Sequence, residues 1–132
     1  MSAIVVGYVD KPEGRAALRR AATEAKLRQA RLVVVNAQGA GSEGTPEADE
    51  AVAGVRAELD AHGLGYEYRE LGQGAEPAED LIAVADEVAA DFIVIGLRRR
   101  SPVGKLILGS NAQRILLDAS CPVLAVKADP DV

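Results

Sequence analysis

Short apolar runs are the feature that most constrains how this chain can fold. They cover residues 3–9, 31–37 and 91–96, and β-branched residues dominate them. Runs of this length and composition are typical of strands that are buried on both faces of a parallel sheet. The segment 66–71 alternates more strictly, which predicts an edge strand with one exposed face. The segment 122–127 predicts the last strand.

Helical segments separate these strands. Pro12, Pro46 and Pro77 each begin a stretch with apolar residues at helical spacing, and a fourth helix is expected from about Ser110 to Ala119. Regular alternation of strands and helices predicts an α/β fold with an open, doubly wound parallel sheet and helices on both faces. Ligands of such sheets bind beyond the carboxyl ends of the strands, where the winding reverses. We therefore expect a site formed by the loops after the first and fourth strands.

Length and composition exclude several classes of protein. A chain of 132 residues predicts a single domain, spanning residues 1–132. One cysteine and one histidine argue against a disulfide framework and against a metal site. Four aromatic residues and no tryptophan argue against a stacking platform for nucleic acid. Without a leader or an apolar run long enough to span a membrane, the chain is expected to be soluble and cytoplasmic.

Charge is distributed unevenly along the chain. Residues 38–91 carry fourteen acidic and two basic side chains, whereas residues 92–127 carry six basic and one acidic side chain. The overall charge of −5 disfavours binding to nucleic acid. The positive C-terminal third suits a small anionic ligand.

The segment from Asp91 to Lys127 carries the motif that bears on function. A strand is expected to end at Gly96, followed by a flexible basic loop that includes Arg98, Arg99 and Arg100. Gly109-Ser110 then begins a helix, and the S-x-x-Q spacing predicts Ser110 as its N-cap. Such a helix start offers free N–H groups to an anion. Two alternatives stay open: Ser110 serves only as a cap, or it binds a ligand. The arginines are either solvated or face a phosphate.

The chain from Ile4 to Lys127 resembles the universal stress protein family, in its small, single-domain bacterial type. The family signature has a glycine, two residues, a second glycine, nine residues, a third glycine and then serine or threonine. Gly96, Gly109 and Ser110 stand at the first, third and fourth positions, and residues 121–126 (CPVLAV) match the closing strand of the family.

This resemblance implies a five-stranded parallel sheet of order 3-2-1-4-5, a homodimer, and ATP or AMP bound where the winding reverses. The residues that it implies for nucleotide binding are Tyr8, Val9, Asp10, Ala37, Gly96, Arg98, Arg99, Gly109, Ser110 and Asn111. It implies neither catalytic residues nor metal ligands.

Two positions depart from the family pattern. Arg99 replaces the second glycine of the signature, which lets the backbone approach the phosphates. Val9 occupies the position where nucleotide-binding members carry an aspartate, and Asp10 is one residue late, on the opposite face of an extended strand. We therefore expect nucleotide affinity below that of typical ATP-binding members.

Three functions remain open at this point. The first is a stress-response regulator or sensor that binds ATP or AMP. The second is a dimeric interaction module that binds no nucleotide, and the residues support it equally. The sequence does not identify its protein partner. The third is a slow ATPase, which the absence of a catalytic constellation disfavours, so we expect no enzyme. Homodimerisation is expected through the last strand, Pro122 to Lys127, because its apolar edge would otherwise stay open to pairing.

Overall fold

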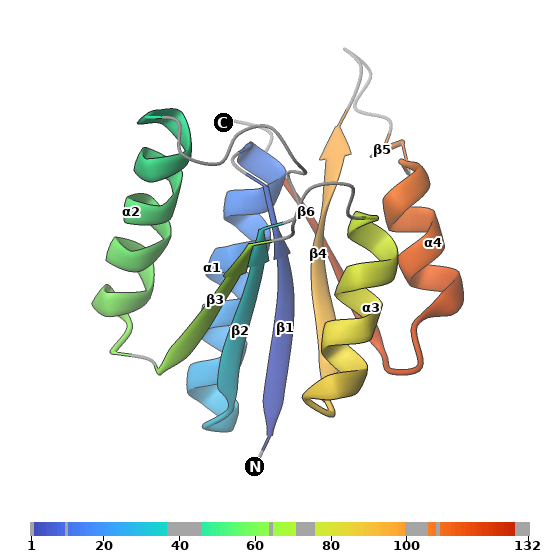
Figure 1. Ribbon diagram of the computed structural model, residues 1–132, viewed down its shortest axis with the longest axis horizontal. Coiled ribbons are helices and arrows are strands. Elements are labelled where there is room, and N and C mark those ends of the chain that lie inside the picture. The colour runs from blue at the N-terminus through green and yellow to red at the C-terminus, as the bar shows by residue number, and fades with distance from the viewer. Residues whose placement is uncertain are drawn as a thin grey trace.

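A computed structural model describes residues 2–9, 11–36, 46–63, 65–70, 76–99, 106–107 and 109–128. Strands and helices alternate along these residues (Figure 1). The strands are β1 (Ala3–Tyr8), β2 (Arg31–Asn36), β3 (Tyr66–Glu70), β4 (Phe92–Arg99), β5 (Leu106–Ile107) and β6 (Val123–Lys127). The helices are α1 (Pro12–Arg28), α2 (Pro46–Ala61), α3 (Pro77–Glu87) and α4 (Ser110–Asp118).

The central sheet has the predicted topology. β1 lies in the middle and pairs in parallel with β2 on one side and with β4 on the other. β3 pairs in parallel with β2, and β6 pairs in parallel with β4. The order is therefore β3-β2-β1-β4-β6, which confirms the expected 3-2-1-4-5 sheet with β6 as its fifth strand.

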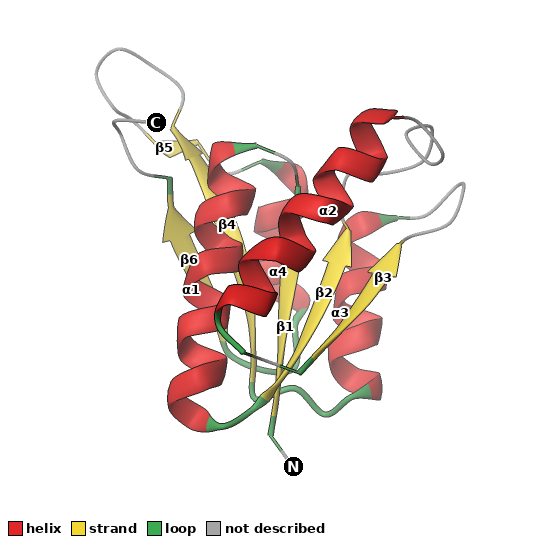
Figure 2. Cartoon of the chain, turned by 90° about the vertical axis from the view of Figure 1, so that its left-hand side faces the viewer, coloured by secondary structure: helices red, strands yellow, loops and turns green. Residues whose placement is uncertain are grey.

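Helices cover both faces of this sheet (Figure 2). Because side chains alternate along a strand, Ile4, Val6 and Tyr8 of β1 join the core under α1 and α2, whereas Val5 joins the core under α3 and α4. Ile4, Val5 and Val6 are fully buried, as expected for a central strand. Among the helices that the structure describes, no helix has both the length and the apolar character that crossing a membrane requires.

The prediction that β4 ends at Gly96 was wrong, and Arg98 and Arg99 do not belong to a loop, whereas the rest of the expected basic loop, from Arg100, lies outside the described residues. β4 continues to Arg99, because Arg98 and Arg99 pair antiparallel with Ile107 and Leu106 of β5. This pairing satisfies backbone groups that a loop would leave to solvent. The other strand ends agree with the expected boundaries to within one residue.

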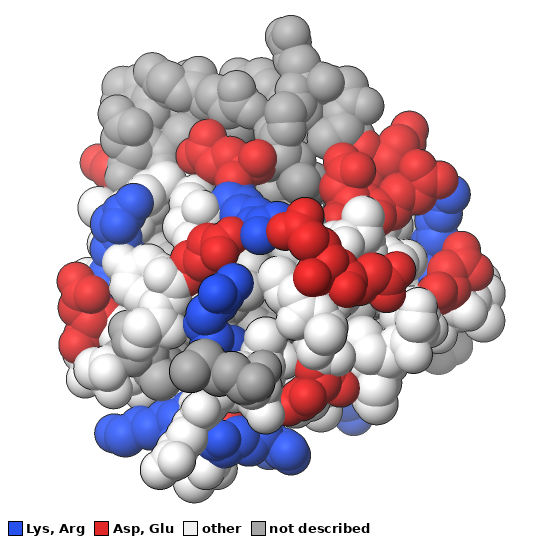
Figure 3. All heavy atoms as spheres, turned by 60° about the horizontal axis from the view of Figure 1, so that its bottom comes forward, with Lys and Arg blue, Asp and Glu red and all other residues white. Residues whose placement is uncertain are grey.

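A chain of ion pairs links β2, β3 and the end of α3. The Arg31 guanidinium contacts Glu67 at 3.1 Å, Arg69 also contacts Glu67, and Arg69 Nη2 lies 2.6 Å from Glu87 Oε2 at the end of α3. Figure 3, which looks toward the amino-terminal end of the sheet, shows acidic and basic side chains interleaved on this surface. Hydrogen bonding and the charge of Arg69 lower the pKa of the Glu87 carboxyl, and the hydrogen bonds to Glu87 and Glu67 raise the pKa of Arg69.

This pair predicts a pH effect on stability. Since the pKa of Glu87 is lower in the folded chain than its ordinary value of 4.5, its stabilisation is complete above that value and is lost as the pH falls through the folded pKa. The free energy of unfolding, measured with urea, should therefore fall less between pH 7 and pH 3 in Glu87→Gln than in the wild type. Because Arg69 also contacts Glu67, Arg69→Gln should still cost some stability in the Glu87→Gln variant, but less than it costs in the wild type. A fully additive double variant would contradict the pairing.

Candidate functional site

The winding of the sheet reverses between β1 and β4, so the carboxyl ends of these strands form the candidate site. Val9 follows β1 directly and is partly exposed. Its carbonyl accepts a hydrogen bond of 2.8 Å from the Lys11 N–H, which turns the chain into α1. The sequence therefore placed Val9 correctly at this edge of the sheet.

Two glycines hold the first turn of α1 close against these strand ends. A Cβ atom on Gly14 would lie 1.8 Å from the Val9 carbonyl oxygen, and one on Gly96 would lie 2.1 Å from the Glu13 carbonyl oxygen. Real Cβ atoms do not approach backbone this closely, so both positions require glycine. Gly96, expected among the nucleotide-binding residues, thus also packs β4 against α1.

The start of α4 differs in detail from the prediction. Gly109, and not Ser110, is the N-cap, since its carbonyl accepts the first helical hydrogen bond, at 3.0 Å, from the Gln113 N–H. Ser110 is the first helical residue, and no side chain of the described chain caps this end. The expected S-x-x-Q capping box is therefore wrong by one position. Gly109, in an extended conformation, is the N-cap residue instead of Ser110.

This helix start is open toward solvent. Gly109, Ser110 and Asn111 are all exposed. Their backbone N–H groups include the donors that an α-helix leaves without intrahelical partners. Together with the positive end of the helix dipole, these donors favour an anionic group. Three predicted site residues thus lie together, on a surface suited to phosphate.

Strand pairing links the arginines to this helix start. Arg98 and Arg99 pair with Ile107 and Leu106, and α4 begins three residues after Ile107. β5, which pairs with the end of β4, therefore immediately precedes α4 in the chain. The positions of these arginine side chains lie outside the described part of the structure.

Tyr8, by contrast, lies away from this surface. Its side chain is 3% exposed and belongs to the core beneath α1 and α2, beside the Asn36 position of β2. Two further predicted residues, Asp10 and Ala37, lie outside the described residues. The structure therefore places Val9 just after β1 and Gly96 within β4, both beside the first turn of α1, and groups Gly109 to Asn111 at the start of α4.

Metal binding and thiol chemistry can be judged for the described residues. They contain no cluster of three histidine, cysteine or carboxylate side chains that could hold a metal ion. Burial, and secondarily the Asp86 carboxylate, raise the pKa of the Cys121 thiol, so the reactive thiolate is disfavoured at neutral pH. The chemistry at the edge of the sheet is suited to binding an anion.

Comparison with known proteins identifies the family. The sequence model described as "Universal stress protein family" matches residues 1–127. The chain belongs to the universal stress protein family. The resemblance inferred from Gly96, Gly109, Ser110 and the closing strand is thereby confirmed.

Three relatives that match this universal stress protein along nearly their whole length illustrate the similarity. A universal stress protein from Mycolicibacterium smegmatis is 43% identical over 94% of this chain and 96% of its own. A solved universal stress protein structure from Archaeoglobus fulgidus is 38% identical, with a TM-score of 0.74, and covers 96% of this chain and 98% of its own. A universal stress protein structure from Archaeoglobus fulgidus in complex with dAMP is 32% identical, has a TM-score of 0.70 and shows the same coverage.

Proposed function

We propose that this universal stress protein binds an adenine nucleotide, AMP or ATP, at the carboxyl edge between β1 and β4. The observation that carries the proposal is the exposed start of α4 at Gly109 and Ser110, where no described side chain accepts a hydrogen bond from the backbone N–H groups. An anionic phosphate there gains hydrogen bonds from backbone N–H groups and a favourable interaction with the helix dipole. The dAMP complex of the relative at 32% identity supports the choice of an adenine nucleotide.

The protein then acts as a stress-response regulator or sensor and not as an enzyme. No metal-binding cluster is present among the described residues, and Cys121 is disfavoured as a thiolate. Occupancy of the site would report the nucleotide pool to a partner. Affinity is low, because Val9 offers no carboxylate to the nucleoside and Arg99 stands where the family pattern has a glycine.

Titration of AMP into the full chain, followed by ¹H–¹⁵N NMR, tests this proposal. Amide shifts are expected at Gly96, Gly109 and Ser110. Ser110→Glu should abolish them, because its carboxylate repels phosphate at the start of α4 while remaining compatible with the helix dipole. Thr23→Glu, which adds the same charge to an exposed position of α1, is the control. Equal binding by Ser110→Glu and the wild type would overturn the proposed site.

The sheet edge at β6 favours a homodimer as a second element of the function. Among the described strands, β6 pairs with β4 alone, and Val123 to Val126 are only half-buried. A second copy paired across a two-fold axis would cover this edge. Sedimentation equilibrium should give about twice the 13.8 kDa monomer mass. A monomer mass that is independent of concentration would overturn the dimer.

A further inference from the structure

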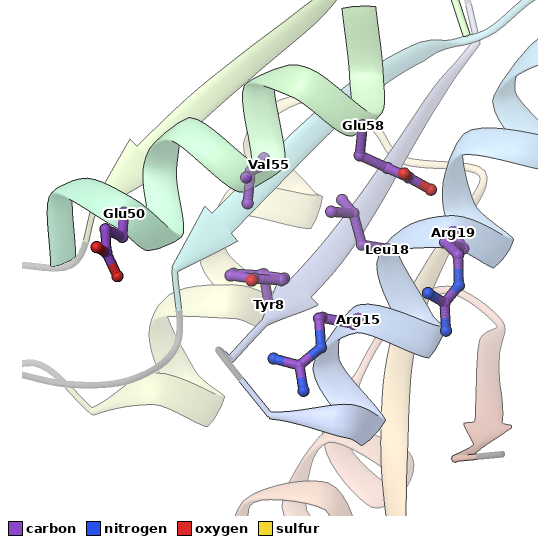
Figure 4. Close-up of a pocket in the computed structure, with 8 residues that line it drawn as sticks. Tyr8, Arg15, Leu18, Arg19, Glu50, Val55 and Glu58 are labelled. Atoms are coloured by element: carbon purple, nitrogen blue, oxygen red, sulfur yellow. The ribbon is translucent and has the colours of Figure 1, made fainter. Parts of the chain in front are cut away.

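A groove between α1 and α2 lies on the face of the sheet opposite to α3 and α4. It encloses about 300 Å³. Its lining residues are Tyr8, Arg15, Leu18, Arg19, Glu50, Gly54, Val55 and Glu58 (Figure 4). None of the described residues at the start of α4 contributes to it. The groove is therefore separate from the proposed phosphate-binding surface.

The two walls of the groove carry opposite charges. Arg15 and Arg19 are one helical turn apart on α1, so their side chains lie on the same face of that helix. Glu50 and Glu58 line the α2 wall, and in Figure 4 the Glu58 side chain extends toward α1. Glu58 lies eight positions after Glu50, which places the two glutamates about 12 Å apart along the helix.

The described residues Arg19, Glu50 and Glu58 form no ion pair with one another across the groove. Within the described part of the chain, neither Arg19 nor Glu50 forms an ion pair, and the ion-pair partner of Glu58 is His62 of its own helix, at 3.7 Å. A cationic wall and an anionic wall therefore face the same space. A purely anionic ligand would meet the glutamates, and a purely cationic ligand would meet the arginines, so a molecule carrying both charges suits the groove best.

The floor between the walls is apolar. Leu18 and Val55 are 3% and 1% exposed, and the Tyr8 ring lies between them and the strand ends. Gly54 contributes no side chain, and a Cβ atom there would meet no heavy atom within 4 Å. The missing side chain keeps the groove open above its aliphatic floor. The volume lies at the small end of the range for ligand pockets.

We propose that this groove binds a small zwitterion of the free amino-acid class with an aliphatic side chain. Its carboxylate pairs with the Arg19 guanidinium, which offers several N–H donors to a carboxylate. Its ammonium group donates to the Glu58 carboxylate. The aliphatic side chain lies over Leu18 and Val55 and gains from leaving water. The site needs no nucleotide, so it is independent of the function proposed above.

L-leucine is the probe, titrated into the full chain and followed by ¹H–¹⁵N NMR. Shifts are expected at Gly54 and Val55 and not at Gly109 or Ser110. Two analogues each lack one charge: 4-methylpentanoate has no ammonium group, and 3-methylbutylamine has no carboxylate. Loss of one charge-assisted contact should weaken the binding of each by roughly tenfold. Equal binding of leucine and either analogue would overturn the zwitterion assignment.

Three variants locate the ligand and a fourth serves as a control. Arg19→Gln and Glu58→Gln should each weaken leucine binding by roughly tenfold. Gly54→Met fills the open floor without altering a charge and should abolish binding. Arg20→Gln removes an exposed arginine of α1 that contacts Glu24 at 3.5 Å, outside the groove, and should leave binding unchanged.

Other outcomes would reject the groove as the site. Absence of leucine shifts in the wild type, unchanged binding by Gly54→Met, or shifts confined to Gly109 and Ser110 would each do so. AMP titrated into the same samples tests the α4 surface separately. If AMP shifts are seen and leucine shifts are not, only the groove proposal fails. If leucine shifts are seen and AMP shifts are not, only the proposed nucleotide site fails.

Discussion

The free energy of unfolding of the variant Gly96→Ala is expected to be about 3 kcal/mol lower than that of the wild type. Overpacking that forces the backbone to shift has a cost of this size. For a domain of this size, that loss corresponds to a melting temperature roughly 10 °C lower. The cause is the 2.1 Å approach of the added Cβ to the Glu13 carbonyl oxygen. A flexible side chain could turn away, but here the first turn of α1 or the strand β4 itself must move.

The matched control is Gly54→Ala. Gly54 lies within α2, is exposed and has open space where a Cβ would be placed. Alanine has the better helix propensity, so this variant should gain about 0.5–1 kcal/mol of stability. Thermal and urea unfolding measure both variants. A Gly96→Ala variant within about 0.5 kcal/mol of the wild type, the range of neutral surface changes, would contradict the close contact with α1.

This contact also bears on the family signature. In the signature, Gly96 is the first glycine and was expected to lie beside a nucleotide. The structure shows that it allows the first turn of α1 to pack on β4, next to the Gly14 contact with Val9. The contact of Gly96 with Glu13 and the contact of Gly14 with Val9 together fix the path of the chain between β1 and α1. Gly96 therefore shapes the binding edge through packing, whether or not its backbone touches a ligand.

The sheet could be predicted from the sequence because burial dictates its pattern. Val5, Val33 and Ile93 are fully buried, and each lies in a short run of β-branched residues, which is typical of a covered parallel strand. Prolines at the start of α1, α2 and α3 gave the helix boundaries, since proline fits the first helical turn without loss of a hydrogen bond.

The details at the site depended on contacts between distant residues. Arg98 and Arg99 extend β4 only because Leu106 and Ile107 turn back to pair with them, and charge alone suggested a loop. The S-x-x-Q spacing identified the start of α4 but not whether Gly109 or Ser110 caps it. The groove could not be predicted from the sequence either, because it forms between two helices that are distant in the chain. The spacing of Arg15 and Arg19 was visible, but α2 had to be placed opposite them.

The variant Val9→Asp is expected to bind AMP more tightly than the wild type, by up to roughly tenfold. Val9 lies at the carboxyl end of β1, partly exposed, with its backbone fixed by the Lys11 N–H and by the packing of Gly14. A carboxylate there would accept a hydrogen bond from the ribose or adenine of a bound nucleotide. Such a contact contributes about 0.5–1.5 kcal/mol, and 1.4 kcal/mol corresponds to a factor of ten in affinity.

Isothermal titration of AMP and ATP into the wild type, Val9→Asp and Arg99→Gly measures this directly. Val88→Asp makes the same chemical change at a half-buried valine at the end of α3, at the opposite edge of the sheet, and should leave affinity unchanged. Tighter binding by Val9→Asp or Arg99→Gly would show that these departures from the family pattern weaken the site. If the wild type binds ATP tightly and both variants bind it less well, Val9 and Arg99 are instead part of a working site. The nucleotide would then be held by the valine side chain and the arginine, and not by the contacts that the family pattern implies.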